Sequence, residues 1–208
     1  MFTGILIALL LWLLVLILSS AISAVVSCKF RNIKLSMATM QFCLIFLSIV
    51  VTILMGDLSI IGLKLDLYYT IIGSITAVLV SIPLAIISRY LPKYEPSFAP
   101  RDVKEFVIFG LILTPFGEEL LFRGMLEGYL LNYAVMPIGV TIPAILFSLV
   151  HAVPFQKAPK KTLLYILISA LVLGLIAGYF RAISGSIAPA VVTHMIFNAA
   201  GFLAFKRK

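Results

Sequence analysis

Charged side chains that could do chemistry interrupt one of the most apolar stretches of this sequence. Glu118, Glu119 and Arg123 fall within the segment 104–131, where leucine, isoleucine and phenylalanine predominate. An ionised side chain at the centre of a bilayer costs about 2.5–3.5 kcal/mol on insertion scales, so such groups face a bundle interior or a wet cavity. We therefore expect all three side chains to be sheltered from lipid.

Helical geometry gives the two adjacent glutamates different surroundings. Glu119, Arg123 and Glu127 recur at intervals of four residues, so they share one helix face, where Arg123 can neutralise Glu119 and also Glu127. Glu118 is rotated by about 100° from that face. We therefore expect Glu118 to be the carboxylate without a partner in its own helix.

Two further polar pairs are each spaced by one helical turn. Phe147 and His151 lie near the end of one apolar run, and His194 and Asn198 lie in the last one. Both histidines of the chain are therefore in predicted membrane spans. His151 is only six residues before Lys157, and a tilt or a break near Pro154 could bring it level with the deeper groups.

Together, Glu118, His151, His194 and Asn198 predict a hydrolase that activates water. A carboxylate in a dry pocket can act as a general base near neutral pH, with a histidine beside it to position the water. A histidine and an asparagine on one helix face can donate hydrogen bonds to a developing oxyanion. No GxSxG motif or other serine or cysteine nucleophile motif competes with this prediction of a peptidase.

Zinc is an alternative to unassisted water activation. Two histidines and one or two glutamates are a plausible zinc shell. However, the sequence has no HExxH motif, and the ligands would come from three separate segments. We therefore expect no metal and no cofactor. Taken singly, a buried histidine or asparagine is often only a structural hydrogen-bonding group.

The composition predicts how these groups are positioned. The chain is 62% hydrophobic and only 12% charged, whereas a soluble domain carries about 25% charged residues. A membrane-spanning helix needs about 20 apolar residues. We expect an all-α, polytopic transmembrane helix bundle of about seven spans, near residues 2–27, 36–56, 67–88, 104–131, 137–153, 162–180 and 186–205.

Local signals organise these spans. The first run is too long for a signal peptide and no positive charge precedes it, so we expect a first helix. Cys28 and Cys43 have no disulfide-framework spacing.

Pro115 and Gly117 should loosen the fourth helix and could let a pocket open toward the cytoplasm. Gly174 and Gly178 form a GxxxG motif, which is typical of close helix packing.

A proline-rich connector near residues 88–105 predicts two parts. Residues 1–100 form an N-terminal part with the first three helices, and residues 101–208 form a catalytic core with four.

The distribution of positive charge predicts the orientation. With the N-terminus outside and the C-terminus cytoplasmic, thirteen of the 16 Lys and Arg residues are cytoplasmic, and Lys64 and Arg181 are outside. The thirteen are Lys29, Arg31, Lys34, Arg89, Lys93, Arg101, Lys104, Lys157, Lys160, Lys161, Lys206, Arg207 and Lys208. The net charge of +8 thus faces membrane lipid, and no nucleic-acid partner is expected.

Three ordered motifs resemble those of a known family. "EELLFR" (Glu118, Glu119, Arg123), "FSLVH" (Phe147, His151) and "HMIFN" (His194, Asn198) are similar to the EExxxR, FxxxH and HxxxN motifs of the CPBP family. These are the CaaX-protease and bacteriocin-processing membrane proteins, also called Abi, and the Rce1-type CaaX prenyl endoproteases resemble them.

This resemblance implies an intramembrane protease with a cavity open to the cytosol. Glu118 and His151 would activate water, and His194 and Asn198 would form the oxyanion hole. Glu119, Arg123 and Phe147 would support them. The substrate would be a prenylated CaaX protein or a bare peptide such as a bacteriocin precursor, and the short chain favours a prokaryotic cell membrane. A non-catalytic immunity or scaffold protein is the alternative.

Overall fold

The computed structural model describes residues 2–206, and this range contains helices but no strand. The helices are α1 (Phe2–Phe30), α2 (Ile33–Leu54), η1 (Leu58–Ile61), α3 (Leu67–Ser88), α4 (Val103–Glu105), η2 (Phe106–Leu113), α5 (Thr114–Glu119), η3 (Leu120–Glu127), α6 (Gly128–Leu130), α7 (Met136–Val150), α8 (Lys160–Ser184) and α9 (Ala188–Lys206). Because α4 to α6 follow one another without interruption, we call residues 103–130 the composite helix. The predicted all-α polytopic bundle is confirmed.

The helices are apolar enough to make this an integral membrane protein. α1, α2, α3 and α8 are each long and apolar enough to cross a bilayer, and α7 and residues 188–204 of α9 are shorter apolar helices. Large apolar side chains of α1, α2 and α3, such as Leu10, Phe46 and Leu79, are exposed. In a membrane protein, these exposed faces contact lipid instead of water.

One predicted boundary differs from the structure in a way that matters. α8 continues to Ser184, so Arg181, which we had placed in an outer loop, lies within the helix. Arg181 is buried and its Nη2 donates a hydrogen bond to the carbonyl oxygen of Ile60. Arg207 and Lys208, counted among the cytoplasmic charges, lie outside the described residues.

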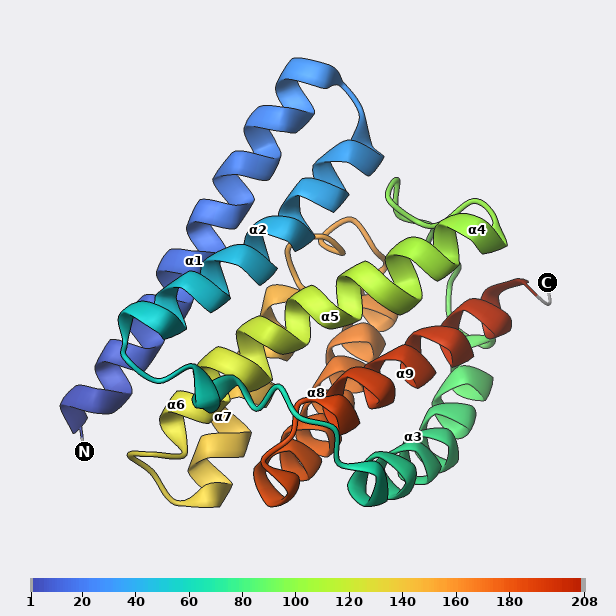
Figure 1. Cartoon of the computed structure of the whole chain (residues 1–208). Helices are drawn as coiled ribbons and strands as arrows, with labels where there is room; N and C mark the ends of the chain where they lie inside the picture. The colour runs from blue at the N-terminus through green and yellow to red at the C-terminus, as the bar shows by residue number, and fades with distance from the viewer. Residues whose placement is uncertain (1, 207–208) are drawn as a thin grey trace.

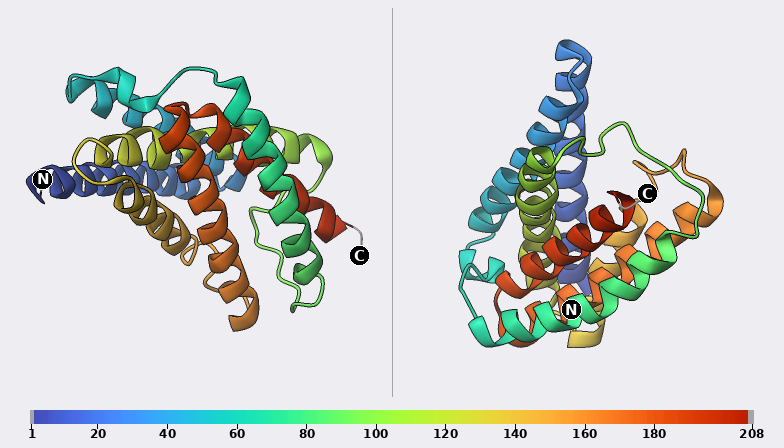
Figure 2. Two further views of the ribbon diagram at one scale, coloured as in Figure 1. Left: turned by 90° about the horizontal axis from the view of Figure 1, so that it is seen from below. Right: turned by 90° about the vertical axis from the view of Figure 1, so that its right-hand side faces the viewer.

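The helices surround the composite helix on several sides. Figures 1 and 2 show α1 and α2 as a hairpin on one side of it, α9 and α3 side by side on another, and α7 paired with α8. α2 also contacts α5, so helices from both parts predicted by sequence pack together. The division near residue 100 therefore stays a prediction.

The composite helix is interrupted by two π-helical segments, η2 and η3, on either side of α5. Pro115 stands at the start of α5 and has no N–H to donate to the preceding turn. A wider π turn before such a residue is a common way to accommodate the missing hydrogen bond, and π turns often occur at functional sites. The loosening that we expected near Pro115 and Gly117 takes this form.

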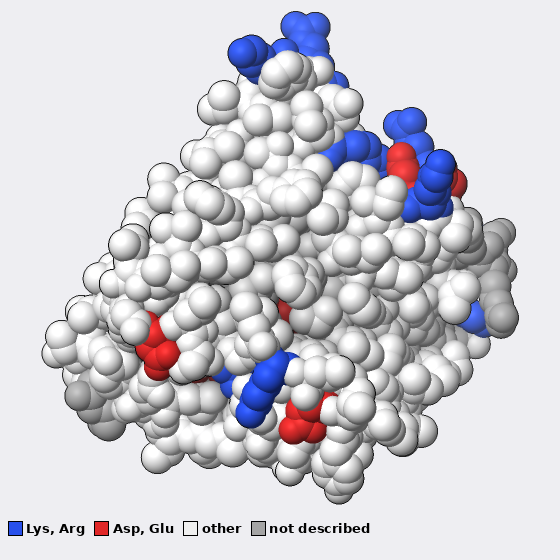
Figure 3. Space-filling view, viewed as in Figure 1, with Lys and Arg blue, Asp and Glu red and all other residues white. Residues whose placement is uncertain are grey.

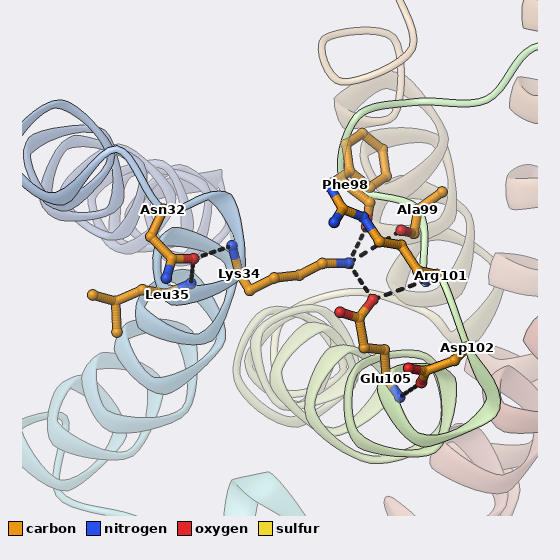
Figure 4. Close-up of polar contacts among 8 residues, drawn as sticks. All are labelled: Asn32, Lys34, Leu35, Phe98, Ala99, Arg101, Asp102 and Glu105. Carbon is orange, nitrogen blue, oxygen red and sulfur yellow. Dashed lines mark hydrogen bonds and ion pairs between the residues drawn. The ribbon is translucent and has the colours of Figure 1, made fainter.

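The connector between the two parts, residues 89–102, is held by hydrogen bonds from two helices, α2 and α8. On one side Lys34 of α2 forms an ion pair with Glu105 (Nζ to Oε2, 2.7 Å) and donates to the carbonyl oxygen of Ala99, as Figure 4 shows. On the other side Thr162 of α8 donates to the carbonyl oxygen of Pro92. Figure 3 shows Lys and Arg gathered over the end of the bundle that contains the α1–α2 turn and the start of α4, above a broad uncharged surface.

Replacing Lys34 by Met should loosen the connector without unfolding the bundle. An ion pair at the surface stabilises only weakly, so we expect chymotrypsin to cut at Tyr94 or Phe98 up to about fivefold faster, with little change in the thermal midpoint. Lys29→Met is the matched control, since the Lys29 ammonium lies over the ring of Phe30 in the preceding helix and not against the connector. Equal cleavage rates in the two variants would contradict this role of Lys34.

Candidate active site

A cavity of about 1020 Å³ lies inside the bundle. Its lining includes all four side chains that the sequence proposed as catalytic: Glu118 of α5, His151 at the end of α7, and His194 and Asn198 of α9. The rest of the lining is mainly apolar and includes residues of the connector. Segments far apart in the sequence thus meet at one cavity.

Glu118 is the carboxylate without a strong partner. Its side chain is 20% exposed, and its nearest recorded partner is His194, with Glu118 Oε2 4.0 Å from His194 Nε2. That oxygen is buried and accepts no hydrogen bond from any described residue. Within the described chain, Glu118 therefore has the capacity to hold a water molecule.

Glu119 has different surroundings, because each of its oxygens lies close to a cationic or hydrogen-bonding side chain. His194 Nδ1 donates to Glu119 Oε1 at 2.8 Å. Arg123 Nε lies 3.3 Å from Glu119 Oε2, and both side chains are completely buried. A buried carboxylate needs such pairing because its desolvation is costly. The hydrogen bond from Nδ1 leaves Nε2 of His194 pointing toward Glu118.

Phe147 packs between these groups. Its buried ring lies 4.5 Å from the guanidinium carbon of Arg123, which places the cation over the ring face. The same ring meets His194 edge-on at 5.6 Å and lies 4.7 Å from the ring of His151. Phe147 therefore separates the Arg123 cation from the two imidazoles and orients all three.

His151 is positioned by the end of α7. The helix ends at Val150, and His151 Nδ1 donates to the carbonyl oxygen of Phe147 at 2.7 Å. A ring nitrogen that donates to a carbonyl carries the hydrogen, so Nε2 of a neutral His151 is a lone-pair acceptor. The ring also stacks on Phe155 in the turn that follows. The break that we expected near Pro154 thus begins at His151 itself.

Asn198 is held by a carbonyl that Pro115 leaves unpaired. In η2 the N–H of Thr114 bonds to the carbonyl of Phe109, five residues earlier. The next bond of this π pattern would run from residue 115 to Gly110, but proline has no N–H. Asn198 Nδ2 donates to the Gly110 carbonyl instead, at 2.8 Å. The second hydrogen of this amide remains available at the cavity.

The acidic residue at the far end of the face shared by Glu119 and Arg123 is not paired as we expected. Neither oxygen of Glu127 accepts a hydrogen bond from a described residue, although Glu127 is fully buried. Arg123 and Arg181 both act on it electrostatically. We had not predicted that Arg181 would lie near enough to Glu127 to interact with its charge, because we placed Arg181 in a loop.

The GxxxG motif of α8 lies against α7 and also against the buried side chains of Arg123 and Glu127. A Cβ at Gly174 would lie 2.9 Å from Arg123 Nη2 and 3.0 Å from the Cα of Ala144. A Cβ at Gly178 would lie 2.7 Å from Glu127 Oε2. These glycines let α8 pack closely on α7 and also make room for the charged side chains of the composite helix.

Sequence reasoning missed Gln41 of α2, which also lines the cavity. An available signal was its position, since it is an amide in an otherwise apolar predicted span. Among the residues that the structure describes, no three His, Cys, Asp or Glu side chains are arranged to hold a metal ion.

Gly174→Ala should destabilise the protein by about 1–3 kcal/mol, since the added methyl group would overpack the contact with Arg123 and Ala144. Gly201→Ala is the matched control, because a Cβ there meets nothing within 4 Å. We expect this control to be neutral or slightly stabilising. Thermal unfolding in detergent measures both. Equal midpoints for the two variants would show that α8 does not need the glycine.

Comparison with known proteins points to one family. Residues 103–200 match the family described as Rce1-like, type II CAAX prenyl endopeptidase Rce1-like. The matched segment runs from α4 into α9, so it contains Glu118, His151, His194 and Asn198 but not the first three helices. Neither the curated proteins nor the solved structures gave a match to this chain.

Proposed function

Since residues 103–200 place this chain in the Rce1-like family of type II CAAX prenyl endopeptidases, we propose that Glu118 is the general base of an intramembrane endopeptidase. The main support is the contrast between two adjacent glutamates, of which Glu118 lines the cavity and Glu119 is completely buried beside it. Glu119 accepts a hydrogen bond from His194 at 2.8 Å and pairs with Arg123 at 3.3 Å, whereas the ion-pair contact of Glu118 within residues 2–206, with His194, is at 4.0 Å.

In the proposed reaction, water between Glu118 and His151 is the nucleophile. His151 Nε2 accepts a hydrogen bond from the water, and Glu118 takes its proton as the oxygen attacks the carbonyl carbon. The tetrahedral intermediate then collapses, the C–N bond breaks, and Glu118 returns the proton to the leaving amine. The support is that His151 donates from Nδ1 to a backbone carbonyl, which leaves Nε2 free to accept.

His194 and Asn198 would stabilise the oxyanion of that intermediate. Asn198 has one amide hydrogen left after binding the Gly110 carbonyl. His194 already donates from Nδ1 to Glu119, so it can donate from Nε2 only as the doubly protonated imidazolium. The Glu119 carboxylate accepts the hydrogen bond from Nδ1 and so orients the ring, which gives the second glutamate a supporting role.

The substrate we propose is a peptide or protein that is presented at the membrane, either prenylated at a C-terminal CaaX sequence or unlipidated. The mainly apolar cavity suits a lipidated or apolar peptide. We also propose that the N-terminus lies outside and the C-terminus in the cytoplasm of a prokaryotic cell, because the positive charges gather at the end of the bundle that contains the connector. The part of the cavity that the connector lines would then face the cytosol.

Glu118→Gln should reduce peptide cleavage at least about 100-fold, since general-base catalysis contributes that much or more. The purified protein would be incubated with farnesylated CaaX and bare peptides side by side, and products identified by mass spectrometry. Glu95→Gln is the control, because it removes a carboxylate from the connector but not from the reacting groups. Wild-type activity in the Glu118 variant would rule out the assigned base.

The same variant separates catalysis from the non-catalytic alternative. An immunity or scaffold protein that only binds a partner should keep its function in cells after Glu118→Gln, because the amide preserves shape and can still hydrogen-bond. An endopeptidase should lose it.

Chelators test the zinc alternative. We expect cleavage to be unchanged after incubation with excess EDTA and 1,10-phenanthroline, since the proposed water activation uses only Glu118 and His151. A loss of activity that zinc restores would support a metal-dependent reaction instead.

A further inference from the structure

Gln41 of α2 is a polar side chain that lines the candidate cavity, and its amide oxygen has no hydrogen-bond partner among residues 2–206. The residue is only 7% exposed, and it lines the same cavity as Glu118. Its Oε1 is buried and accepts no hydrogen bond from any residue in the described range. Burying an amide oxygen without a hydrogen bond costs free energy of folding, so the presence of Gln41 at this place needs an explanation.

The backbone beside Glu118 is shaped to receive this amide. A Cβ at Gly117 would lie 2.4 Å from Gln41 Oε1 and 3.2 Å from the Gln41 carbonyl oxygen. A side chain larger than glycine at position 117 would therefore push the Gln41 amide out of its place and press on the backbone of α2. The contact holds the Gln41 amide next to the residue that precedes Glu118 in the chain.

The chemistry of the side chain indicates what it binds. A glutamine amide presents an acceptor oxygen and donor hydrogens side by side, and this pair is complementary to a main-chain peptide group. An extended peptide offers such groups at regular intervals, and enzymes commonly bind them through main-chain hydrogen bonds. The mainly apolar lining of the cavity offers few competing polar groups.

We propose that Gln41 binds a main-chain peptide group of the substrate next to the scissile bond, accepting its N–H at Oε1. This proposal rests on the proposed endopeptidase function. It assigns part of the substrate site to α2, which lies outside the segment that matches the family. The ligand is an extended peptide backbone, independent of its side chains.

A chemical double-mutant cycle tests the proposal. Peptides in which one backbone N–H near the scissile bond is replaced by an ester oxygen would be cleaved by wild type and by Gln41→Met, whose side chain has similar size but no amide. In wild type we expect one ester position to lower kcat/KM about tenfold. The same ester should have no effect in Gln41→Met, because the two changes remove one hydrogen bond.

Controls distinguish binding from a structural role. Gln156→Met changes the exposed glutamine in the turn after α7 and should keep the full sensitivity to the ester. If Gln41→Met does not fold, Gln41→Asn withdraws the amide by one methylene and should also lose the sensitivity. A structural role would slow the cleavage of every peptide equally.

The outcomes separate the two proposals. Equal ester sensitivity in wild type and both Gln41 variants overturns the role of Gln41 and leaves the endopeptidase intact. If wild type cleaves none of the parent amide peptides, the proposed function fails and the role of Gln41 fails with it.

Discussion

The buried pairing of Glu119 with Arg123 and His194 is the constraint on which the rest of the site depends. Glu119 and Arg123 are fully excluded from solvent, and an unpaired charge in such surroundings would be strongly destabilising. The pair therefore forces α9 to present His194 to the composite helix, and Phe147 of α7 covers the guanidinium from another side. Three helices are brought into register by the need to neutralise two charges.

The backbone of the composite helix imposes a second constraint. A π-helical turn precedes Pro115, and the proline cannot supply the N–H that this pattern requires at the Gly110 carbonyl. Asn198 takes that place, so the missing hydrogen bond in one helix becomes an attachment point for another. Irregular backbone at membrane depth is tolerated only where it is buried in protein or lines a cavity, and here Phe109, Gly110 and Thr114 line the cavity.

These two constraints explain how adjacent glutamates acquire different properties. Glu119 points into the ion pair, and Glu118 lines the cavity, where Nε2 of His194 lies 4.0 Å from its Oε2. The hydrogen bond from His194 Nδ1 to Glu119 also turns the opposite nitrogen of that ring toward Glu118. Two glycines allow neighbouring side chains to lie close to the helix backbone: Arg123 lies against Gly174, and Gln41 lies against Gly117.

The sequence by itself determined the all-α bundle of apolar helices, the three motifs and the placement of Glu118 and Glu119 on different sides of one helix, because hydropathy and residue spacing report burial and helix faces directly. Only the tertiary structure decided that His194 binds Glu119, that Asn198 binds the Gly110 carbonyl, that Gln41 lines the cavity, and that Arg181 is buried against Ile60. Those contacts join residues up to 121 positions apart, as between Arg181 and Ile60. No local pattern specifies such pairs, since they arise from how closely whole helices can pack.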